Sequence, residues 1–227
     1  MRQRVTSRRS FDNPAAMSIG ELLQQGGWAM WPIYACSVVG VAVFVKKLID
    51  LFSARIFDLG WFEGVLERVR AGSDDEALSI LQASRHPASR VLAATLNVWR
   101  RRPDRAEAEA RRVGSLEVQK AESFLALLSF IAQAAPLLGL LGTVLGMVDL
   151  FLGLQASGLR EIDVSLLSSG IWKALLTTAA GLTVAVPSLG AYSYLAHRAD
   201  TLRLQIIDLV QQLLTEMHTR DELEPST

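Results

Sequence analysis

Cysteine, histidine and an excess charge of either sign are scarce in this chain of 227 residues. Its single cysteine is Cys36, so an internal disulfide is excluded and no redox framework is predicted. Lys and Arg together number 23, and so do Asp and Glu, so the net charge does not predict nucleic-acid binding. His86, His197 and His218 are isolated from one another in the sequence. We expect these histidines at the surface rather than in a metal site.

Motifs for catalysis are missing as well. The sequence has no Walker loop, no zinc-ligand spacing, no nucleophile elbow and no dinucleotide fingerprint. Enzymatic activity is therefore not predicted, and no cofactor or metal is expected.

Three long uncharged runs are present instead, at residues 22–45, 123–148 and 174–196. About 20 apolar residues are enough to cross the hydrocarbon core of a bilayer. The sequence therefore predicts an all-α integral membrane protein with three transmembrane helices and long cytoplasmic helical extensions.

The distribution of charge predicts how these helices are oriented. Arginine and lysine are concentrated between the first two runs and after the third, and such basic excess marks the cytoplasmic side. The N-terminus and the loop between the second and third runs are then periplasmic. Four arginines within the first nine residues oppose this orientation, but Met17 offers an alternative start, so residues 1–16 are hypothesised to be an upstream extension. The predicted segments are an N-terminal extension at 1–21, transmembrane helix 1 at 22–45, a cytoplasmic helical segment at 46–122, transmembrane helix 2 at 123–152, a periplasmic loop at 153–169, transmembrane helix 3 at 170–197, and a cytoplasmic C-terminal helix and tail at 198–227.

The cytoplasmic segment is predicted to be helical. Ser73 to Glu76 form a capping box that starts one helix, and a second helix is expected at about 89–101. A third begins at Pro103. From there to about Leu152 the sequence offers no helix breaker other than Gly114, Pro136 and the membrane glycines, so one helix of about 70 Å is expected to run into the second span.

The third span is expected to continue in the same way, through residues 197–218. An apolar stripe at helical spacing supports this extension. Its members are Leu202, Ile206, Leu209, Leu213 and Leu214.

The second and third runs are rich in small residues, which let membrane helices approach closely. Gly142 and Gly146 form a GxxxG pair, a common helix-contact motif. Two prolines can bend their helices or free backbone carbonyls, which suits a pore and suits plain packing equally. The predicted helix-packing residues are Pro136, Gly139, Gly142, Gly146, Gly181 and Pro187.

Two charges border these runs. Asp149 ends the apolar part of the second span and Lys173 begins that of the third, both toward the outer face. If Thr143 and Thr178 lie at one depth, Asp149 stands about 9 Å and Lys173 about 7.5 Å above them. The two charges then either meet as an ion pair or reach separately toward lipid headgroups.

The centres of the three runs contain no carboxylate and no histidine. This chain therefore lacks a titrating group of its own at mid-membrane, and proton flow requires one from another polypeptide. Thr143 and Thr178 can offer hydroxyls to water or to a partner carboxylate. Alternatively, each hydroxyl bonds back to a carbonyl one turn earlier and has only a local role.

Two stretches resemble the signatures of the MotA/TolQ/ExbB proton-channel family. Residues 135–147 read APLLGLLGTVLGM and residues 170–182 read GIWKALLTTAAGL. The start of the first run, ELLQQGGW at 21–28, is also similar. Three spans resemble the ExbB and TolQ branches rather than the four-span MotA branch.

The resemblance implies an inner-membrane pentamer around two ExbD/TolR-like helices, each from a single-span protein whose membrane aspartate carries the proton. It also implies that the complex works on a TonB- or TolA-like protein, and that Thr143 and Thr178 line the pore. Lys173 departs from the family pattern, which has a glutamate there. A cation at the outer mouth repels incoming cations unless Asp149 or a partner carboxylate neutralises it.

The competing hypothesis is a membrane scaffold subunit that does not conduct ions. It predicts that Thr143 and Thr178 tolerate valine, whereas Gly142 and Gly146 do not tolerate bulk. The residues do not separate an ExbB role from a TolQ role, and they do not distinguish protons from sodium ions.

Overall fold

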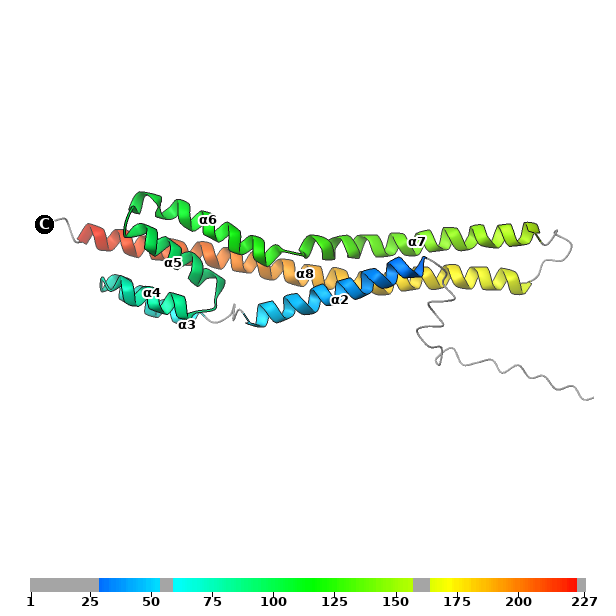
Figure 1. Ribbon diagram of the computed structural model, residues 1–227, viewed down its shortest axis with the longest axis horizontal. Helices are drawn as coiled ribbons and strands as arrows, with labels where there is room; N and C mark the ends of the chain where they lie inside the picture. Colours follow the sequence, from blue (N-terminus) through cyan, green and yellow to red (C-terminus); the bar gives the residue numbers. More distant parts are fainter. Residues whose placement is uncertain (1–28, 54–58, 157–163, 224–227) are drawn as a thin grey trace, which may run out of the picture. The chain divides into compact units, whose positions relative to one another are not determined.

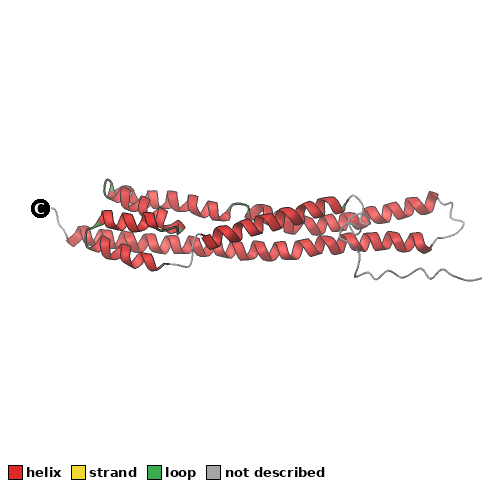
Figure 2. Cartoon of the chain, turned by 60° about the horizontal axis from the view of Figure 1, so that its bottom comes forward, coloured by secondary structure: helices red, strands yellow, loops and turns green. Residues whose placement is uncertain are grey.

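The computed structural model describes residues 29–53, 59–156 and 164–223, and the regular elements in these ranges are all helices (Figures 1 and 2). They are α2 (Met30–Ser53), α3 (Gly60–Arg70), α4 (Asp74–Ala83), α5 (Pro87–Trp99), α6 (Pro103–Glu122), α7 (Leu125–Ala156) and α8 (Val164–Leu223). The all-helical prediction is confirmed for this part of the chain. The predicted extension at 1–21, the alternative start at Met17 and residues 157–163 of the predicted loop lie outside the described residues.

Three helical stretches are long and apolar enough to cross a membrane, as predicted. They lie within Met30–Asp50, Pro103–Gln155 and Leu167–Leu223. Their outward-facing side chains are largely aliphatic or aromatic; Val41 in α2, Leu137 in α7 and Val186 in α8 are examples. Such faces suit contact with lipid or with other membrane helices.

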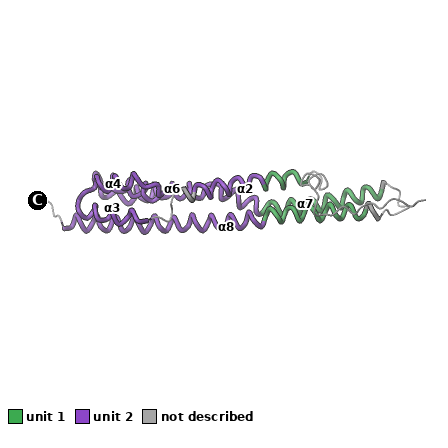
Figure 3. Tube along the Cα trace, turned by 90° about the horizontal axis from the view of Figure 1, so that it is seen from below, with its two compact units in different colours: residues 1–37, 133–185 green, residues 38–132, 186–227 purple. Residues whose placement is uncertain are grey.

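The chain divides into two compact units, which Figure 3 colours separately. Unit 1 takes its described residues from 1–37 and 133–185, and therefore holds most of α7 and the first part of α8. Unit 2 comprises 38–132 and 186–227.

The core of unit 2 lies between the short helices α3 to α6 and the C-terminal part of α8. Leu202, Ile206, Leu209 and Leu213 of α8 are buried there among side chains of α3, α4, α5 and α6. Their spacing places them on one face of the helix. The predicted extension of the third span and its apolar stripe are thus confirmed.

Charged contacts tie the end of α8 to α3 and α4. Arg70 donates two hydrogen bonds to the carboxylate of Glu216, one of them at 2.9 Å. Arg220 donates to Asp74 at 2.7 Å and to the backbone carbonyl of Val69 at 3.1 Å, and both side chains of the Arg220–Asp74 pair are mostly buried. These bonds align three helix ends over the apolar core.

Two local expectations are corrected by the structure. Helix α4 begins at Asp74 as expected, but Ser73 makes no side-chain cap hydrogen bond, so the capping box is wrong. Backbone angles of −90° and 61° at Ser73 differ from the extended geometry that such a cap needs. His86 is buried rather than at the surface, because its Nδ1 accepts the Ala88 N–H at 3.1 Å and caps α5.

The single long helix expected from Pro103 to about Leu152 is also wrong. Helix α6 ends at Glu122 and α7 starts at Leu125, with Phe124 between them at a φ of 67°. This left-handed conformation is uncommon for a bulky residue. The left-handed conformation of Phe124 interrupts the helix, although neither a glycine nor a proline is present at this point.

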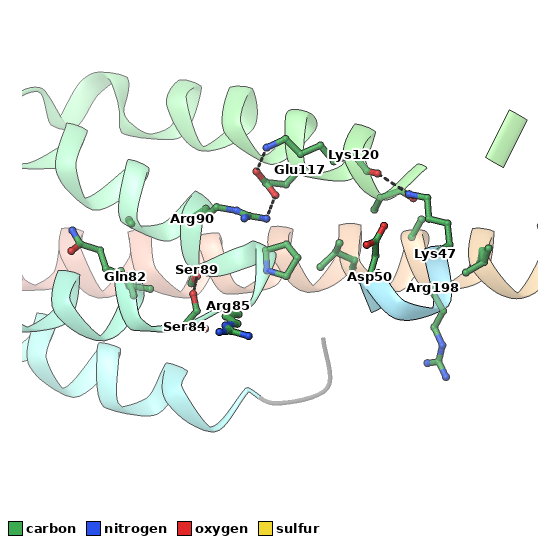
Figure 4. A pocket seen from close by; sticks show the side chains of 17 residues that line it. Lys47, Asp50, Gln82, Ser84, Arg85, Ser89, Arg90, Glu117, Lys120 and Arg198 are labelled. Carbon is green, nitrogen blue, oxygen red and sulfur yellow. Dashed lines mark hydrogen bonds and ion pairs between the residues drawn. The ribbon is translucent and has the colours of Figure 1, made fainter. Parts of the chain in front are cut away.

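Lys47 of α2 occupies the break between α6 and α7. Its Nζ donates to the backbone carbonyls of Lys120 and Ala121, both at 3.0 Å (Figure 4). It also donates to the Ser123 hydroxyl at 3.0 Å. A helix C-terminus carries unpaired carbonyls and a partial negative charge, and a buried ammonium group satisfies both. Lys46 contributes separately, with its Nζ 4.7 Å from the centre of the Phe124 ring. The two lysines that follow the first apolar run therefore hold this break in place.

Replacing Lys47 with methionine should weaken this junction. The change keeps the length of the side chain but removes the ammonium group from the Ala121 carbonyl, at a cost of about 1–3 kcal/mol, whereas the Lys120 carbonyl still accepts from the Ser123 hydroxyl at 2.7 Å. Thermal unfolding of the purified protein in detergent measures the loss. Lys46→Met is the matched control, since it removes only a cation–π contact of about 0.5–1 kcal/mol at an exposed site. Equal losses for the two variants contradict the capping role.

Candidate functional site

Helices α7 and α8 pack against each other in unit 1 through a ladder of small residues. Gly139 faces Gly181, Gly142 faces Thr177 and Gly146 faces Ala174. Residue numbers rise on one helix as they fall on the other, so the two helices are antiparallel. Small side chains at these steps allow the backbones to approach closely.

The closeness of this packing can be measured at each glycine. A Cβ atom added at Gly181 would lie 2.5 Å from the carbonyl oxygen of Ala135, and one at Gly142 would lie 2.6 Å from the Thr177 hydroxyl. A Cβ at Gly139 would lie 3.0 Å from the Thr177 carbonyl, whereas one at Gly146 would be in ordinary contact, 3.4 Å from Ala174. The structure thus places all four predicted packing glycines at one helix contact.

The two prolines lie inside helices that continue through them. Pro136 is within α7 and Pro187 is within α8. Each lacks the N–H that would bond the carbonyl four residues earlier, which belongs to Ala132 and Thr183 respectively. Both prolines therefore leave a helix carbonyl short of its usual donor without ending the helix.

The two predicted pathway threonines are bonded differently. Thr143 donates to the carbonyl of Leu140 on its own helix at 2.6 Å. This is the predicted alternative in which the hydroxyl bonds to a carbonyl one turn earlier. Thr178 donates across to the carbonyl of Gly139 on α7, at 3.3 Å. Both side chains are half-buried in the chain alone. With their protons directed at carbonyls, both hydroxyl oxygens keep lone pairs that can accept hydrogen bonds.

Thr177, which the sequence did not single out, is the hydroxyl residue most deeply placed in this contact. It is fully buried, packs on Gly142 and donates to the Ala174 carbonyl at 2.8 Å. A signal for it exists in the sequence. Ala174, Thr177 and Gly181 are small residues at steps of three and four, and so are Gly139, Gly142 and Gly146.

The structure brings the two border charges together. Lys173 Nζ lies 3.4 Å from Asp149 Oδ2, with about a third of the lysine side chain and two thirds of the aspartate side chain exposed. Of the two predicted alternatives, the structure therefore has the ion pair, and the two side chains do not extend separately toward lipid headgroups. A pair so exposed contributes little to stability, but it cancels the charge of Lys173 locally.

Comparison with known proteins shows to which family this chain belongs. The family model described as the MotA/TolQ/ExbB proton channel family matches residues 83–207, which is more than half of the chain and includes the whole ladder. The chain belongs to this family. It is accordingly a multi-pass membrane protein of a channel family rather than an enzyme.

Individual proteins named ExbB or TolQ are also similar to this chain. Biopolymer transport protein exbB1 of Vibrio cholerae is 30% identical over 186 residues, covering 81% of each chain. A putative ExbB homologue of Methanothermobacter thermautotrophicus is 29% identical over 194 residues, covering 85% of this chain and 68% of the relative. The Tol-Pal system protein TolQ of Haemophilus influenzae is 30% identical over 102 residues, covering 45% of this chain and 44% of the relative.

Proposed function

We propose that this chain is the ExbB/TolQ-like subunit of an inner-membrane motor driven by the proton-motive force. Five copies surround an ExbD/TolR-like partner, and the complex acts on a TonB- or TolA-like protein that reaches toward the outer membrane. The N-terminus is periplasmic and the C-terminus cytoplasmic, as the basic residues of 46–122 and of the tail favour. Membership of the proton channel family and the relatives named for biopolymer transport and the Tol-Pal system support this assignment.

The observation that carries the proposal is a hydroxyl-bearing helix pair with no titrating group of its own. The uncharged runs of α7 and α8 contain no carboxylate and no histidine. Thr143 and Thr178 direct their protons at carbonyls, and their oxygens remain free to accept. A protonated carboxylic acid on a neighbouring helix is the complementary donor, so the titrating group belongs to the single-span partner.

The charges at the outer end of the pair fit entry of a cation. Alone, Lys173 would repel protons arriving at the mouth. Asp149 at 3.4 Å neutralises it within the same chain. In this assignment Asp149 replaces, from α7, the negative charge that the family has at position 173.

Reconstitution with a partner tests this function. The chain is incorporated into liposomes with a single-span protein that carries one membrane aspartate, and proton flux is followed with an internal pH dye under an imposed potential. We expect flux from the complex, none from the chain alone, and none after replacement of the partner aspartate by asparagine. An assembled complex that never conducts supports the scaffold function instead, for which the tight glycine ladder is sufficient.

A further inference from the structure

Unit 2 contains an open cavity of about 760 Å³ at the ends of all three apolar runs (Figure 4). Helix α2 contributes Lys47 and Asp50, which follow the first run. Lys120 of α6 precedes the second run, and Leu195 and Arg198 of α8 lie at the end of the third. In a protein that spans the bilayer with these runs, such a cavity lies at the depth of the lipid headgroups.

The polar lining of the cavity is predominantly basic. Five cationic side chains and two carboxylates line it. They are Lys47, Arg85, Arg90, Lys120 and Arg198, with Asp50 and Glu117. The cavity therefore has an excess of positive charge that attracts an anion.

Some of these charged side chains already form hydrogen bonds or ion pairs within the protein. Glu117 is buried and accepts from Arg90 at 2.6 Å and from Lys120 at 2.7 Å, as Figure 4 shows. Lys47 donates to two carbonyls and a hydroxyl at the α6–α7 break. Arg85, in the connection between α4 and α5, is exposed, and no other described residue forms a hydrogen bond or ion pair with it. Its guanidinium is thus available to a ligand.

The remaining wall of the cavity is apolar. It is formed by aliphatic side chains from four helices, among them Leu81, Ala93, Leu195, Ala199 and Leu202. A small hydrophilic anion gains nothing from such a wall. An amphipathic anion gains from both parts of the lining, because its charged group meets Arg85 while its apolar part covers the aliphatic side chains.

From this lining we propose that the cavity binds the phosphate headgroup of an anionic membrane phospholipid, with Arg85 as its principal contact. Basic pockets between membrane helices on the cytoplasmic side suit such headgroups. A guanidinium binds phosphate oxygens through two parallel hydrogen bonds, which favours Arg85 over a lysine in this role. The inference rests on the membrane placement in the proposed function and goes beyond its proton chemistry.

Binding of lipid to the full-length protein tests this site directly. Purified protein in detergent is titrated with phosphatidylglycerol or with phosphatidylcholine, and bound lipid is counted by native mass spectrometry. We expect preferential binding of phosphatidylglycerol, weakened about fivefold by Arg85→Gln, since one basic residue contributes on the order of a fivefold change in affinity for anionic lipid. Arg85→Lys should retain more of the affinity than Arg85→Gln.

The control is Arg101→Gln, which removes an exposed arginine that does not line the cavity. Equal phosphatidylglycerol binding by Arg85→Gln and Arg101→Gln overturns the site. Inorganic phosphate that displaces the lipid at millimolar concentration overturns the lipid source, because the cavity then recognises any soluble phosphate. Neither measurement involves proton flux, so a complex that fails to conduct leaves the lipid result standing.

Discussion

Replacement of Gly181 with alanine is expected to destabilise the α7–α8 pair by about 1–3 kcal/mol, the usual cost of overpacking. The added methyl group would lie 2.5 Å from the Ala135 carbonyl and 3.1 Å from Gly139 Cα. Both atoms belong to the backbone of α7, so no side-chain rotation can relieve the clash. The helices have to separate, and the steps at Gly142 and Gly146 loosen with them. Thermal unfolding of the purified protein in detergent measures the effect.

Two glycines of the same pair of helices provide controls. An added Cβ at Gly190 of α8 would meet no atom within 4 Å beyond its chain neighbours and the nearby backbone of its own helix, and at Gly146 the nearest such atom is at 3.4 Å. Alanine favours the helix over glycine by about 1 kcal/mol at any of these positions. Gly190→Ala and Gly146→Ala should therefore be neutral or stabilising. A Gly181→Ala protein as stable as Gly190→Ala would falsify the close contact.

Replacement of Thr178 with valine is expected to lower proton flux through the reconstituted complex by about 2- to 12-fold. A hydrogen bond between neutral groups, such as the threonine oxygen and a protonated carboxylic acid, contributes about 0.5–1.5 kcal/mol, and loss of that amount from the rate-limiting barrier gives this range. Valine keeps the shape of threonine but offers no oxygen to a partner carboxylic acid. It also removes the 3.3 Å bond to the Gly139 carbonyl, which is long enough to contribute little to folding. The substitution should therefore lower proton flux while leaving the stability of the folded protein nearly unchanged.

Thr183→Val is the matched control on the same helix. Thr183 is exposed and donates to its own helix, to the Ala179 carbonyl at 2.8 Å. Its replacement should leave flux within about twofold of the parent, a barrier change of under 0.5 kcal/mol. Undiminished flux in Thr178→Val, with the complex intact by size-exclusion chromatography, favours the scaffold function. Equal losses in both variants indicate a general effect of removing hydroxyls.

Structural features that arise from local patterns of residues could be predicted from the sequence. Helices are the form in which apolar runs of this length satisfy their backbone groups in a membrane, so the all-helical architecture follows from composition. The stripe from Leu202 to Leu213 has a helical period because one face must be buried. The meeting of Asp149 and Lys173 remained one of two possibilities, because spacing along a helix gives depth but not the direction of the side chain.

The break between α6 and α7 illustrates what spacing cannot reveal. Neither Ser123 nor Phe124 is a helix breaker by type. The carbonyls at this helix end are bound by Lys47, more than 70 positions earlier, as well as by the adjacent Ser123. His86 is similar, since its burial depends on Trp61, whose ring lies 5.7 Å away, as well as on the N-terminus of α5. Contacts between distant parts of a chain leave no local periodic signal.

By itself the sequence determined the helical class, the three hydrophobic runs, the absence of a mid-membrane acid and the family signatures, because each is a property of contiguous residues. The tertiary structure alone decided which small residues face each other, that Thr178 bonds across to α7 while Thr143 bonds back, and that basic residues gather around one cavity at the ends of the runs. These features depend on the rotation and register of one helix against another. Packing sets both, and a single helix does not encode them.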